Sequence, residues 1–285
     1  MFLKKQELEN KVKVFSPAKI NLSLEILGKR SDGYHDLYTI FKTIQFGDEL
    51  TVNWISGERQ LHCSNPEVPL GNENLILKAA AAVEEVVGFS IPIEVHLEKK
   101  IPMGAGLGGG SSNAAAILKL LGERYHISDQ ILMRAAAELG SDVPFFLRGG
   151  TAFAKGKGEQ LELLPDFPSL PLVLIKPPFS ISTAFAYSQV RSYTSGKNSL
   201  KLSRSIKEGE GLSSFQHFVN DFEVYLFPVY PQLEQIKNIF LENGALAAQV
   251  TGSGSALFAF ASDESHACEL AEKVRDFGEV WMTKT

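Results

Sequence analysis

The segment of the sequence that most clearly indicates a binding site is the glycine-rich stretch 102–113, which leads directly into an expected helix. Five glycines fall within the seven positions 104–110, so the backbone there can approach a ligand without interference from Cβ atoms. The free N–H groups and the positive dipole end of the following helix favour an anion. Ser111 and Ser112 add hydroxyls that could reach phosphate oxygens or a magnesium ion. The segment therefore predicts a phosphate cradle in preference to a flexible linker.

Known phosphate-loop patterns narrow the kind of cradle. Gly104-x-Gly106-x-x-Gly109 formally matches the dinucleotide fingerprint, but that fingerprint needs a strand after the helix, and here a second helix is expected. The sequence contains no GxxxxGK[ST] motif, and it lacks the HRD and DFG motifs of protein kinases. Dinucleotide binding, P-loop and protein-kinase chemistry are thus all disfavoured.

Lys19 and Asn21 form a second candidate cluster, on a short strand after Pro17. Residues two apart on a strand point to the same face. Burial of an unpaired ammonium is costly, so we expect Lys19 to face a functional site or an acidic partner. An exposed strand lysine is the alternative.

Asp142 follows an expected helix, at a turn before Pro144. An aspartate in such a place often serves only as a turn or cap residue. Phosphoryl transfer, however, needs a group that positions or deprotonates a hydroxyl, a cation against the developing charge, and a phosphate cradle. Asp142, Lys19 and the glycine segment supply these three types. The segment 251–255 is either a simple hairpin turn or a second cradle.

Strands and helices must hold these residues in place. In the first part of the chain we expect strands at 12–15, 20–27 and 91–98, helices at 75–87, 112–121 and 129–139, and a hairpin formed by 145–147 and 151–154. The proline-rich stretch 164–171 marks a boundary, so we expect domains at residues 1–168 and 169–285.

The second part predicts a different order of elements. We expect a strand at 172–175, a helix at 233–241, strands at 247–250 and 256–260, a helix at 264–275 and a final strand at 279–283. This β-α-β-β-α-β order is typical of the ferredoxin-like arrangement. A helical insert is expected around 182–226, in which the polar segment 192–211 is predicted to be an exposed loop. The fold class is therefore α+β.

The amino-acid composition indicates the broad class of protein. The chain has 285 residues, 44% hydrophobic and 21% charged, which is ordinary globular usage and corresponds to about two domains. The net charge of −5 argues against a nucleic-acid partner, whose contact face is normally basic. The two cysteines are far apart, and the absence of CxxC, CxxH and HExxH spacing argues against zinc. No apolar run reaches the ~18 residues of a membrane helix, and the charged N-terminus does not resemble a signal peptide. We expect a cytoplasmic protein without a membrane partner, either monomer or homodimer.

Taken together, these motifs closely resemble the GHMP small-molecule kinases. The three motifs of that superfamily match residues 17–22, 102–112 and 251–255, in order and spread over almost the full chain. Within the superfamily, the segments 31–36, 140–146, 156–159 and 220–223 are similar to members whose acceptor is a cytidine diphosphate methylerythritol. The resemblance implies ATP- and Mg2+-dependent phosphorylation of that substrate's 2-hydroxyl, in the non-mevalonate isoprenoid pathway. It also implies a two-domain fold, with a ribosomal-protein-S5-like N-terminal domain, a ferredoxin-like C-terminal domain and the substrate bound between them.

The resemblance also implies roles for residues of the phosphoryl-transfer centre. Asp142 would be the catalytic aspartate, and Asn21 would contact the substrate. Lys19 would be the partner of Asp142 and would either lower the pKa of the substrate hydroxyl or stabilise the charged transition state. The ATP phosphates would be wrapped by Pro102, Gly104, Gly106, Leu107, Gly108, Gly109, Gly110, Ser111 and Ser112. The magnesium-binding glutamate of the superfamily has no counterpart that we can identify here. The metal ligands therefore stay open, with Ser112 as a candidate.

At the other end of the site, the resemblance implies recognition of a nucleobase. Tyr34 and His35 would recognise the cytosine, because a neutral imidazole can both donate and accept a hydrogen bond. Tyr187 would stack on the base, and Thr183 would assist the same pocket. Tyr187 could instead be an ordinary core aromatic.

Two alternatives remain open. The first is a related GHMP kinase that acts on homoserine or a mevalonate derivative, against which the Gly-Tyr-His segment at 33–35 and Tyr187 argue, since those acceptors carry no nucleobase. The second is a non-catalytic nucleotide-binding sensor, which would need neither Lys19 nor Asp142.

Overall fold

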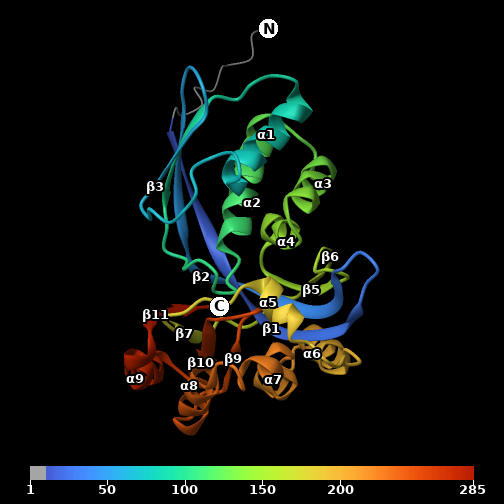
Figure 1. Ribbon diagram of the computed structural model, residues 1–285, viewed down its shortest axis with the longest axis vertical. Coiled ribbons are helices and arrows are strands. Elements are labelled where there is room, and N and C mark those ends of the chain that lie inside the picture. The colour runs from blue at the N-terminus through green and yellow to red at the C-terminus, as the bar shows by residue number, and fades with distance from the viewer. Residues whose placement is uncertain (1–10) are drawn as a thin grey trace.

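Two β-sheets organise the protein, which a computed structural model describes over residues 11–285 (Figure 1). The first sheet has seven strands, with β3-β4-β2-β1-β8 in order, β5 paired with β2, and β6 paired with β5. Its strands are β1 (Lys11–Lys29), β2 (His35–Trp54), β3 (Gln60–Cys63), β4 (Ile93–Glu98), β5 (Thr151–Lys155), β6 (Gln160–Leu164) and β8 (Val219–Asn220). The helices of this half are α1 (Leu75–Val87), α2 (Gly109–Arg124), α3 (Asp129–Leu139) and α4 (Val143–Arg148).

The second sheet has four strands in the order β11-β7-β10-β9. It contains β7 (Pro171–Lys176), β9 (Ala247–Val250), β10 (Leu257–Phe260) and β11 (Glu279–Lys284), with helices α8 (Pro231–Glu242) and α9 (Glu264–Val274) as the connections. A short 3-10 turn, Arg275–Phe277, follows α9. The predicted β-α-β-β-α-β order is confirmed. Between β7 and α8 the insert forms α5 (Thr183–Ser188), α6 (Lys197–Glu208), the 3-10 segment Gly211–His217, β8 and α7 (Phe222–Leu226).

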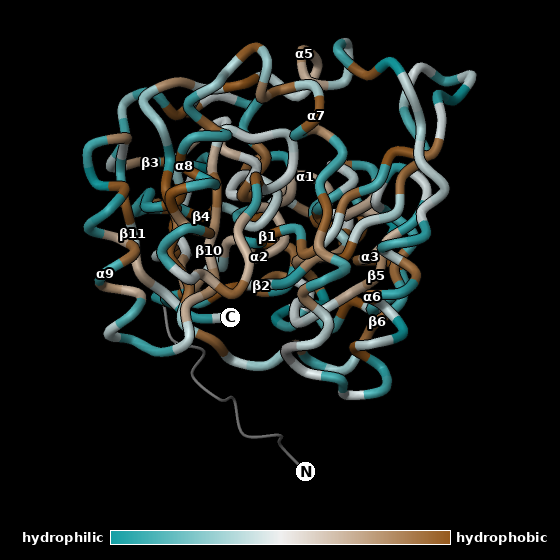
Figure 2. The backbone as a smooth tube through the Cα atoms, turned by 90° about the horizontal axis from the view of Figure 1, so that it is seen from below, coloured by the Kyte–Doolittle hydropathy of each residue, from teal (hydrophilic) through white to brown (hydrophobic). Residues whose placement is uncertain are grey.

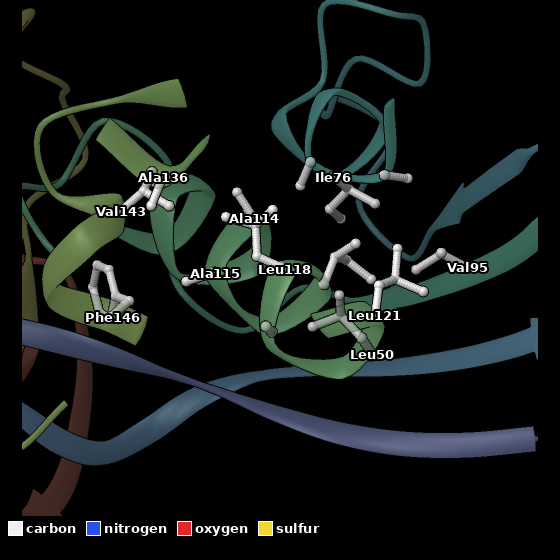
Figure 3. Close-up of a cluster of buried hydrophobic side chains, with 14 of the residues drawn as sticks. Leu50, Ile76, Val95, Ala114, Ala115, Leu118, Leu121, Ala136, Val143 and Phe146 are labelled. Carbon is white, nitrogen blue, oxygen red and sulfur yellow. The ribbon is translucent and has the colours of Figure 1, made fainter. Parts of the chain in front are cut away.

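Helix α2 is the central helix of the first half, and its position fixes the glycine segment that precedes it. Its buried face carries Ala114, Ala115, Leu118 and Leu121, which pack between α1, α4 and the sheet (Figure 3). The small alanines allow the helix to approach its neighbours closely, and burial of the leucines contributes about 2 kcal/mol each. The start of α2 is therefore rigidly placed.

A further buried cluster joins the two sheets. Ile20 and Leu22 of β1 and Phe153 of β5 pack with Phe258 and Phe260 of β10, and all five side chains are almost fully inaccessible. Figure 2 shows how hydropathy is distributed along the backbone, with hydrophobic stretches in the interior and hydrophilic ones in the peripheral loops. The two halves are thus joined by a buried apolar cluster.

Two sequence predictions are wrong. The expected strand at 145–147 is part of α4, because Pro144 suits the first turn of a helix and Phe145 is fully buried there. The expected loop at 192–211 contains α6, whose Leu202 and Ile206 are buried. The polar composition of that segment hid a helix whose two buried apolar side chains lie four residues apart.

Within the described part of the chain, no helix is both long and apolar enough to cross a membrane.

Candidate active site

A cavity of about 1000 Å³ collects residues from both halves of the molecule. Its walls come from β1, the start of β2, the glycine segment, the α3–α4 junction, α5 and the turn between β9 and β10. All predicted site residues except Ser112 line it. Predicted site residues as far apart in the sequence as Lys19 and Tyr187 are therefore brought to one place.

The glycine segment forms one wall, and its conformation requires glycine at two positions. Gly106 (φ +77°) lies against the backbone of Thr251, so that an added Cβ would collide with the Thr251 carbonyl oxygen. Gly108 (φ +73°) is the N-cap of α2 and lies next to the ring of Phe146 and the side chain of Lys19. The cap has no side-chain hydrogen bond, so the first N–H groups of α2 face the cavity without a protein cap. This is the environment that an anion needs.

A buried carboxylate anchors the start of this segment. Asp48 of β2 is fully buried and accepts hydrogen bonds from the backbone N–H groups of Lys100 and Ile101, each at 2.7 Å. It also accepts from Lys99 Nζ at 2.6 Å and from Asn113 Nδ2 at 2.9 Å. One carboxylate thereby ties β2, the residues before the glycine segment and the first turn of α2. Sequence reasoning missed Asp48, because Gly47-Asp48 has the composition of a turn rather than of a strand interior.

Lys19 lies on β1 with its ammonium inside the cavity wall and is only 4% exposed. Its Nζ donates to Asn21 Oδ1 at 2.6 Å and lies 5.2 Å from the centre of the Phe41 ring. Asn21 is itself fixed, since its Nδ2 donates to Thr39 Oγ1 at 2.8 Å. Burial lowers the pKa of Lys19 from its ordinary value, and the charge of Asp142 opposes that shift. Asn21 therefore orients the ammonium that β1 delivers to the cavity.

Asp142 lies at the N-cap position of α4, yet its side chain makes no capping hydrogen bond. Asp142, Lys19 and Tyr187 all line the cavity, and the negative charge of Asp142 acts to raise the pKa of both Lys19 and Tyr187. Over residues 11–285, no ion pair within 4.0 Å joins Asp142 to Lys19. The alternative that Asp142 is only a cap residue is thus not supported, and space remains between the two charges.

The charges around the cavity are strongly unequal. Among the described residues that line it, Asp142 is the sole carboxylate, whereas the lysines are Lys19, Lys29, Lys157 and Lys99, of which Lys99 is paired with the buried Asp48. The overall charge of the chain is negative, so this excess of cations is local. Such a cavity attracts polyphosphates.

Aromatic side chains line the end of the cavity that lies near the connection between β1 and β2. The rings of His35 and Tyr187 stack with centroids 4.8 Å apart and planes inclined by 16°. Tyr34 is 59% exposed, and Lys157 Nζ lies 4.5 Å from the centre of its ring. Thr183, on the same helix as Tyr187, shares a hydrogen bond of 3.1 Å with Ser253. In this structure the stacking partner of Tyr187 is His35.

Ser112 is the predicted residue that the structure does not bring into the cavity. It is buried, and its hydroxyl accepts a 2.8 Å hydrogen bond from Ser16. The neighbouring Ser111 lines the cavity instead. The loop hydroxyl available to a ligand or metal is therefore that of Ser111.

The turn at 251–255 also contributes, although we predicted no individual site residue there. Gly252 and Ser253 line the cavity, and the Thr251 hydroxyl accepts from Asn21 N at 3.2 Å. Asn220 Nδ2 donates to the carbonyls of Val250 at 2.7 Å and Gly252 at 2.9 Å, which holds the turn in place. The Thr-Gly-Ser-Gly-Ser pattern was the available signal.

The oxygen ligands that face the cavity suit magnesium. Mg²⁺ retains several waters and needs only one or two protein carboxylates besides substrate phosphates. Asp142 and the hydroxyls of Ser111 and Ser253 are such donors. When bound, the ion would neutralise part of the phosphate charge.

Two family models match the chain. The description "GHMP kinases N terminal domain" matches residues 74–150, and "GHMP kinases C terminal" matches residues 204–280. The first match contains the glycine segment and Asp142, and the second contains the turn at 251–255.

Individual relatives cover nearly the whole chain. The 4-diphosphocytidyl-2-C-methyl-D-erythritol kinase of Pelotomaculum thermopropionicum is 40% identical over 277 residues, which is 94% of this chain and 96% of the relative. The kinase of the same name from Prosthecochloris aestuarii is 41% identical over 268 residues, 92% of this chain and 93% of the relative.

Solved structures agree. A crystal structure of 4-(cytidine 5'-diphospho)-2C-methyl-D-erythritol kinase superposes with a TM-score of 0.80 at 34% identity, covering 96% of this chain and 98% of that one. Homoserine kinase from Cytophaga hutchinsonii superposes with a TM-score of 0.77, covering 99% of this chain and 97% of that one, but it is only 20% identical, so it supports the fold alone.

Proposed function

Because the chain belongs to the GHMP kinases, in the family of the 4-diphosphocytidyl-2-C-methyl-D-erythritol kinases, we propose that it transfers the γ-phosphoryl group of ATP to the 2-hydroxyl of 4-diphosphocytidyl-2-C-methyl-D-erythritol. This reaction supplies the non-mevalonate isoprenoid pathway. The division into domains 1–168 and 169–285 belongs to the proposal, as does a cytoplasmic location, which the free thiols of Cys63 and Cys268 support.

One observation carries the assignment of the chemistry. A carboxylate without a capping role, Asp142, faces the same cavity as the buried ammonium of Lys19, beside the uncapped start of α2. A direct transfer needs an acceptor hydroxyl held between a base and a phosphate cradle. The gap between the two charged groups is where that hydroxyl binds in our proposal.

Each residue then has a distinct task. Asp142 accepts the hydrogen bond, and finally the proton, of the acceptor hydroxyl. Lys19 stabilises negative charge that develops between the hydroxyl oxygen and the transferred group. Asn21 holds the Lys19 ammonium at 2.6 Å and so fixes its direction. The α2 N-terminus and the glycine segment bind the ATP phosphates, and Ser111 would help to hold Mg²⁺, which would neutralise part of their charge.

The aromatic end receives the cytidine part of the acceptor. His35 recognises the edge of the pyrimidine, and the stacked pair His35–Tyr187 forms the wall against which the base lies. Tyr34 covers the base from the exposed side. Lys29 and Lys157 line the same end and suit the diphosphate that links the base to the alcohol.

The direct test is an ADP-release assay with purified protein, ATP and Mg²⁺. We expect turnover with the cytidylated methylerythritol and none with homoserine or mevalonate. Turnover with homoserine or mevalonate alone would assign the chain to another GHMP activity, and ATP binding without turnover of any of the three would identify a sensor.

The recognition of cytosine has its own test. His35→Ala should raise the KM for the acceptor by at least about tenfold, the effect of a lost interaction worth 1.4 kcal/mol, while the KM for ATP stays unchanged. Tyr187→Leu should do the same, and Tyr187→Phe, which keeps the ring, should have little effect. Wild-type acceptor KM values in both His35→Ala and Tyr187→Leu would overturn this part of the proposal.

A further inference from the structure

A group of three side chains that could bind a metal ion lies outside the cavity, at the edge of the first sheet. β3 is the edge strand and runs parallel to β4, with His62 paired to His96. Glu94 lies two residues before His96, so it points to the same face of β4. Both histidines are exposed and Glu94 is half-buried, and none of the three lines the cavity described above.

The three side chains converge. His96 Nε2 lies 3.1 Å from Glu94 Oε2, and His62 Nε2 lies 3.5 Å from Glu94 Oε1. The two imidazoles stack with centroids 4.7 Å apart and planes inclined by 21°. One potential ligand atom from each residue can be chosen so that all lie within 4.8 Å of one another.

The cluster has a supporting residue on the next strand. Asn53 of β2 is paired with Glu94, and its Nδ2 donates to Glu94 Oε2 at 2.8 Å. Such a hydrogen bond fixes the direction of a carboxylate, which is the usual role of groups behind metal ligands. The cluster therefore involves three adjacent strands.

Two imidazoles and one carboxylate are ligands that zinc prefers, with metal–ligand distances of about 2.0–2.2 Å. Mg²⁺ prefers oxygen ligands, so the ion of the kinase reaction does not compete effectively for this cluster. Exposed side chains can close the remaining distance by small rotations, and the open side leaves a position for water. We propose that His62, Glu94 and His96 form a site for a zinc ion at the edge of the first sheet.

Occupation of the site would fasten the edge strand. β3 has only four residues, and its attachment continues at Ser64, whose N–H donates to Leu97 O at 3.0 Å and whose Oγ accepts from Lys99 N at 2.9 Å. A metal ion shared by His62 and His96 links β3 to β4 through side chains as well as backbone. We therefore expect zinc to raise the thermal stability of the chain.

The test is calorimetric titration of untagged, chelator-treated protein with Zn²⁺, in buffer that contains Mg²⁺ but no nucleotide. We expect one Zn²⁺ per chain and a rise in Tm. His62→Gln and His96→Gln should each weaken zinc binding by more than about tenfold, and Asn53→Ala should weaken it by about tenfold. Co²⁺ as a probe should give visible absorption bands that disappear in the histidine variants.

The matched control is His126→Asn, since His126 is exposed elsewhere and has a positive φ of 54°, which asparagine tolerates. It should bind zinc as the wild type does. Kinase turnover with Mg²⁺ should be unchanged in every variant, because these residues lie outside the cavity, and this also verifies folding. Wild-type zinc affinity in the double variant His62→Gln/His96→Gln would overturn the proposal, as would zinc binding that His126→Asn abolishes.

Discussion

At the scale of single residues, Asp142 is the side chain whose replacement separates binding from chemistry. Asp142→Asn keeps the shape of the side chain but removes the proton acceptor. We expect kcat to fall by about 10²–10⁴-fold, the usual contribution of general base catalysis, while the KM for ATP changes little. Steady-state kinetics measures both, with the exposed Asp276→Asn as the control. A kcat close to the wild-type value would remove Asp142 from the mechanism.

His35 gives the acceptor site a defined pH dependence. Burial lowers the pKa of His35 from its ordinary value, and the charge of Lys29 lowers it further. The ring is therefore neutral at pH 7 and able to both donate and accept. We expect the acceptor KM to be constant from about pH 8 to about pH 6.5 and to rise only below the lowered pKa of His35.

Lys29→Ala removes one cause of that shift. The pKa of His35 should then be higher, so the rise of the acceptor KM should begin at a higher pH than in the wild type. Initial rates at saturating ATP across this pH range measure the onset, and Lys201→Ala, an exposed lysine on α6, is the control. An unchanged onset would show that His35 does not determine the profile.

Site residues could be predicted from the sequence only where a pattern among neighbouring residues, such as alternation along a strand, indicates which side chains lie together. Alternation along one strand placed Lys19 and Asn21 on one face, and the two side chains are indeed hydrogen-bonded. Asp48 was not predictable, because its importance depends on the backbone of residues 100 and 101, more than fifty positions away. The pair His62–His96 was missed for the same reason, since strand pairing creates it.

At the scale of elements, the glycine segment combines positions that are packed tightly against the backbone with positions that have room for a side chain. In Gly106→Ala, the added Cβ would collide with the Thr251 carbonyl at a positive φ. Gly110 has only Leu75 Cδ1 near its added Cβ, at 3.7 Å. We expect Gly106→Ala to cost about 1–3 kcal/mol of stability. Gly110→Ala should be neutral or stabilise by up to about 1 kcal/mol. Urea denaturation compares them, and equal effects would contradict this division.

The Asp48 anchor makes a separate prediction. Asp48→Asn would leave the Lys99 ammonium, whose side chain is 6% exposed, without its charged partner. We expect a loss of about 3–5 kcal/mol in the free energy of unfolding, since breaking a buried ion pair from one side is strongly destabilising. Adding Lys99→Met should recover part of this loss, because no unpaired ammonium then remains. A loss below about 0.5 kcal/mol in Asp48→Asn would contradict the assignment.

Helices and strands whose apolar residues recur at regular spacing could be predicted from the sequence, whereas α6 could not. Its first turn is stabilised from a distance, since Ser199 N donates to Glu25 Oε2 of β1 at 2.6 Å. Burial of Leu202 and Ile206 against the first sheet then offsets the polar composition of the helix.

At the scale of the whole molecule, the two halves differ in how far sequence reasoning reaches. The β-α-β-β-α-β order of elements in the second half follows from local sequence patterns and was predicted correctly, although the pairing of β7 with β10 and β11 joins residues more than eighty positions apart. The first sheet depends on distant pairings, such as β2 with β4 and with β5, and β1 with β8. No local pattern encodes such partners, so β2 as a single strand of 20 residues was not foreseen.

The shared interior between the sheets has a thermodynamic consequence. Side chains of β1 and β5 are buried against those of β10, so melting of either half would expose apolar side chains of the other. Differential scanning calorimetry should therefore record one endotherm, with a van't Hoff enthalpy equal to the calorimetric enthalpy. Two resolved endotherms would mean that the halves melt independently. A single endotherm would mean that the cavity residues of both halves lose their arrangement at one temperature, so that heat inactivation and loss of tertiary structure coincide.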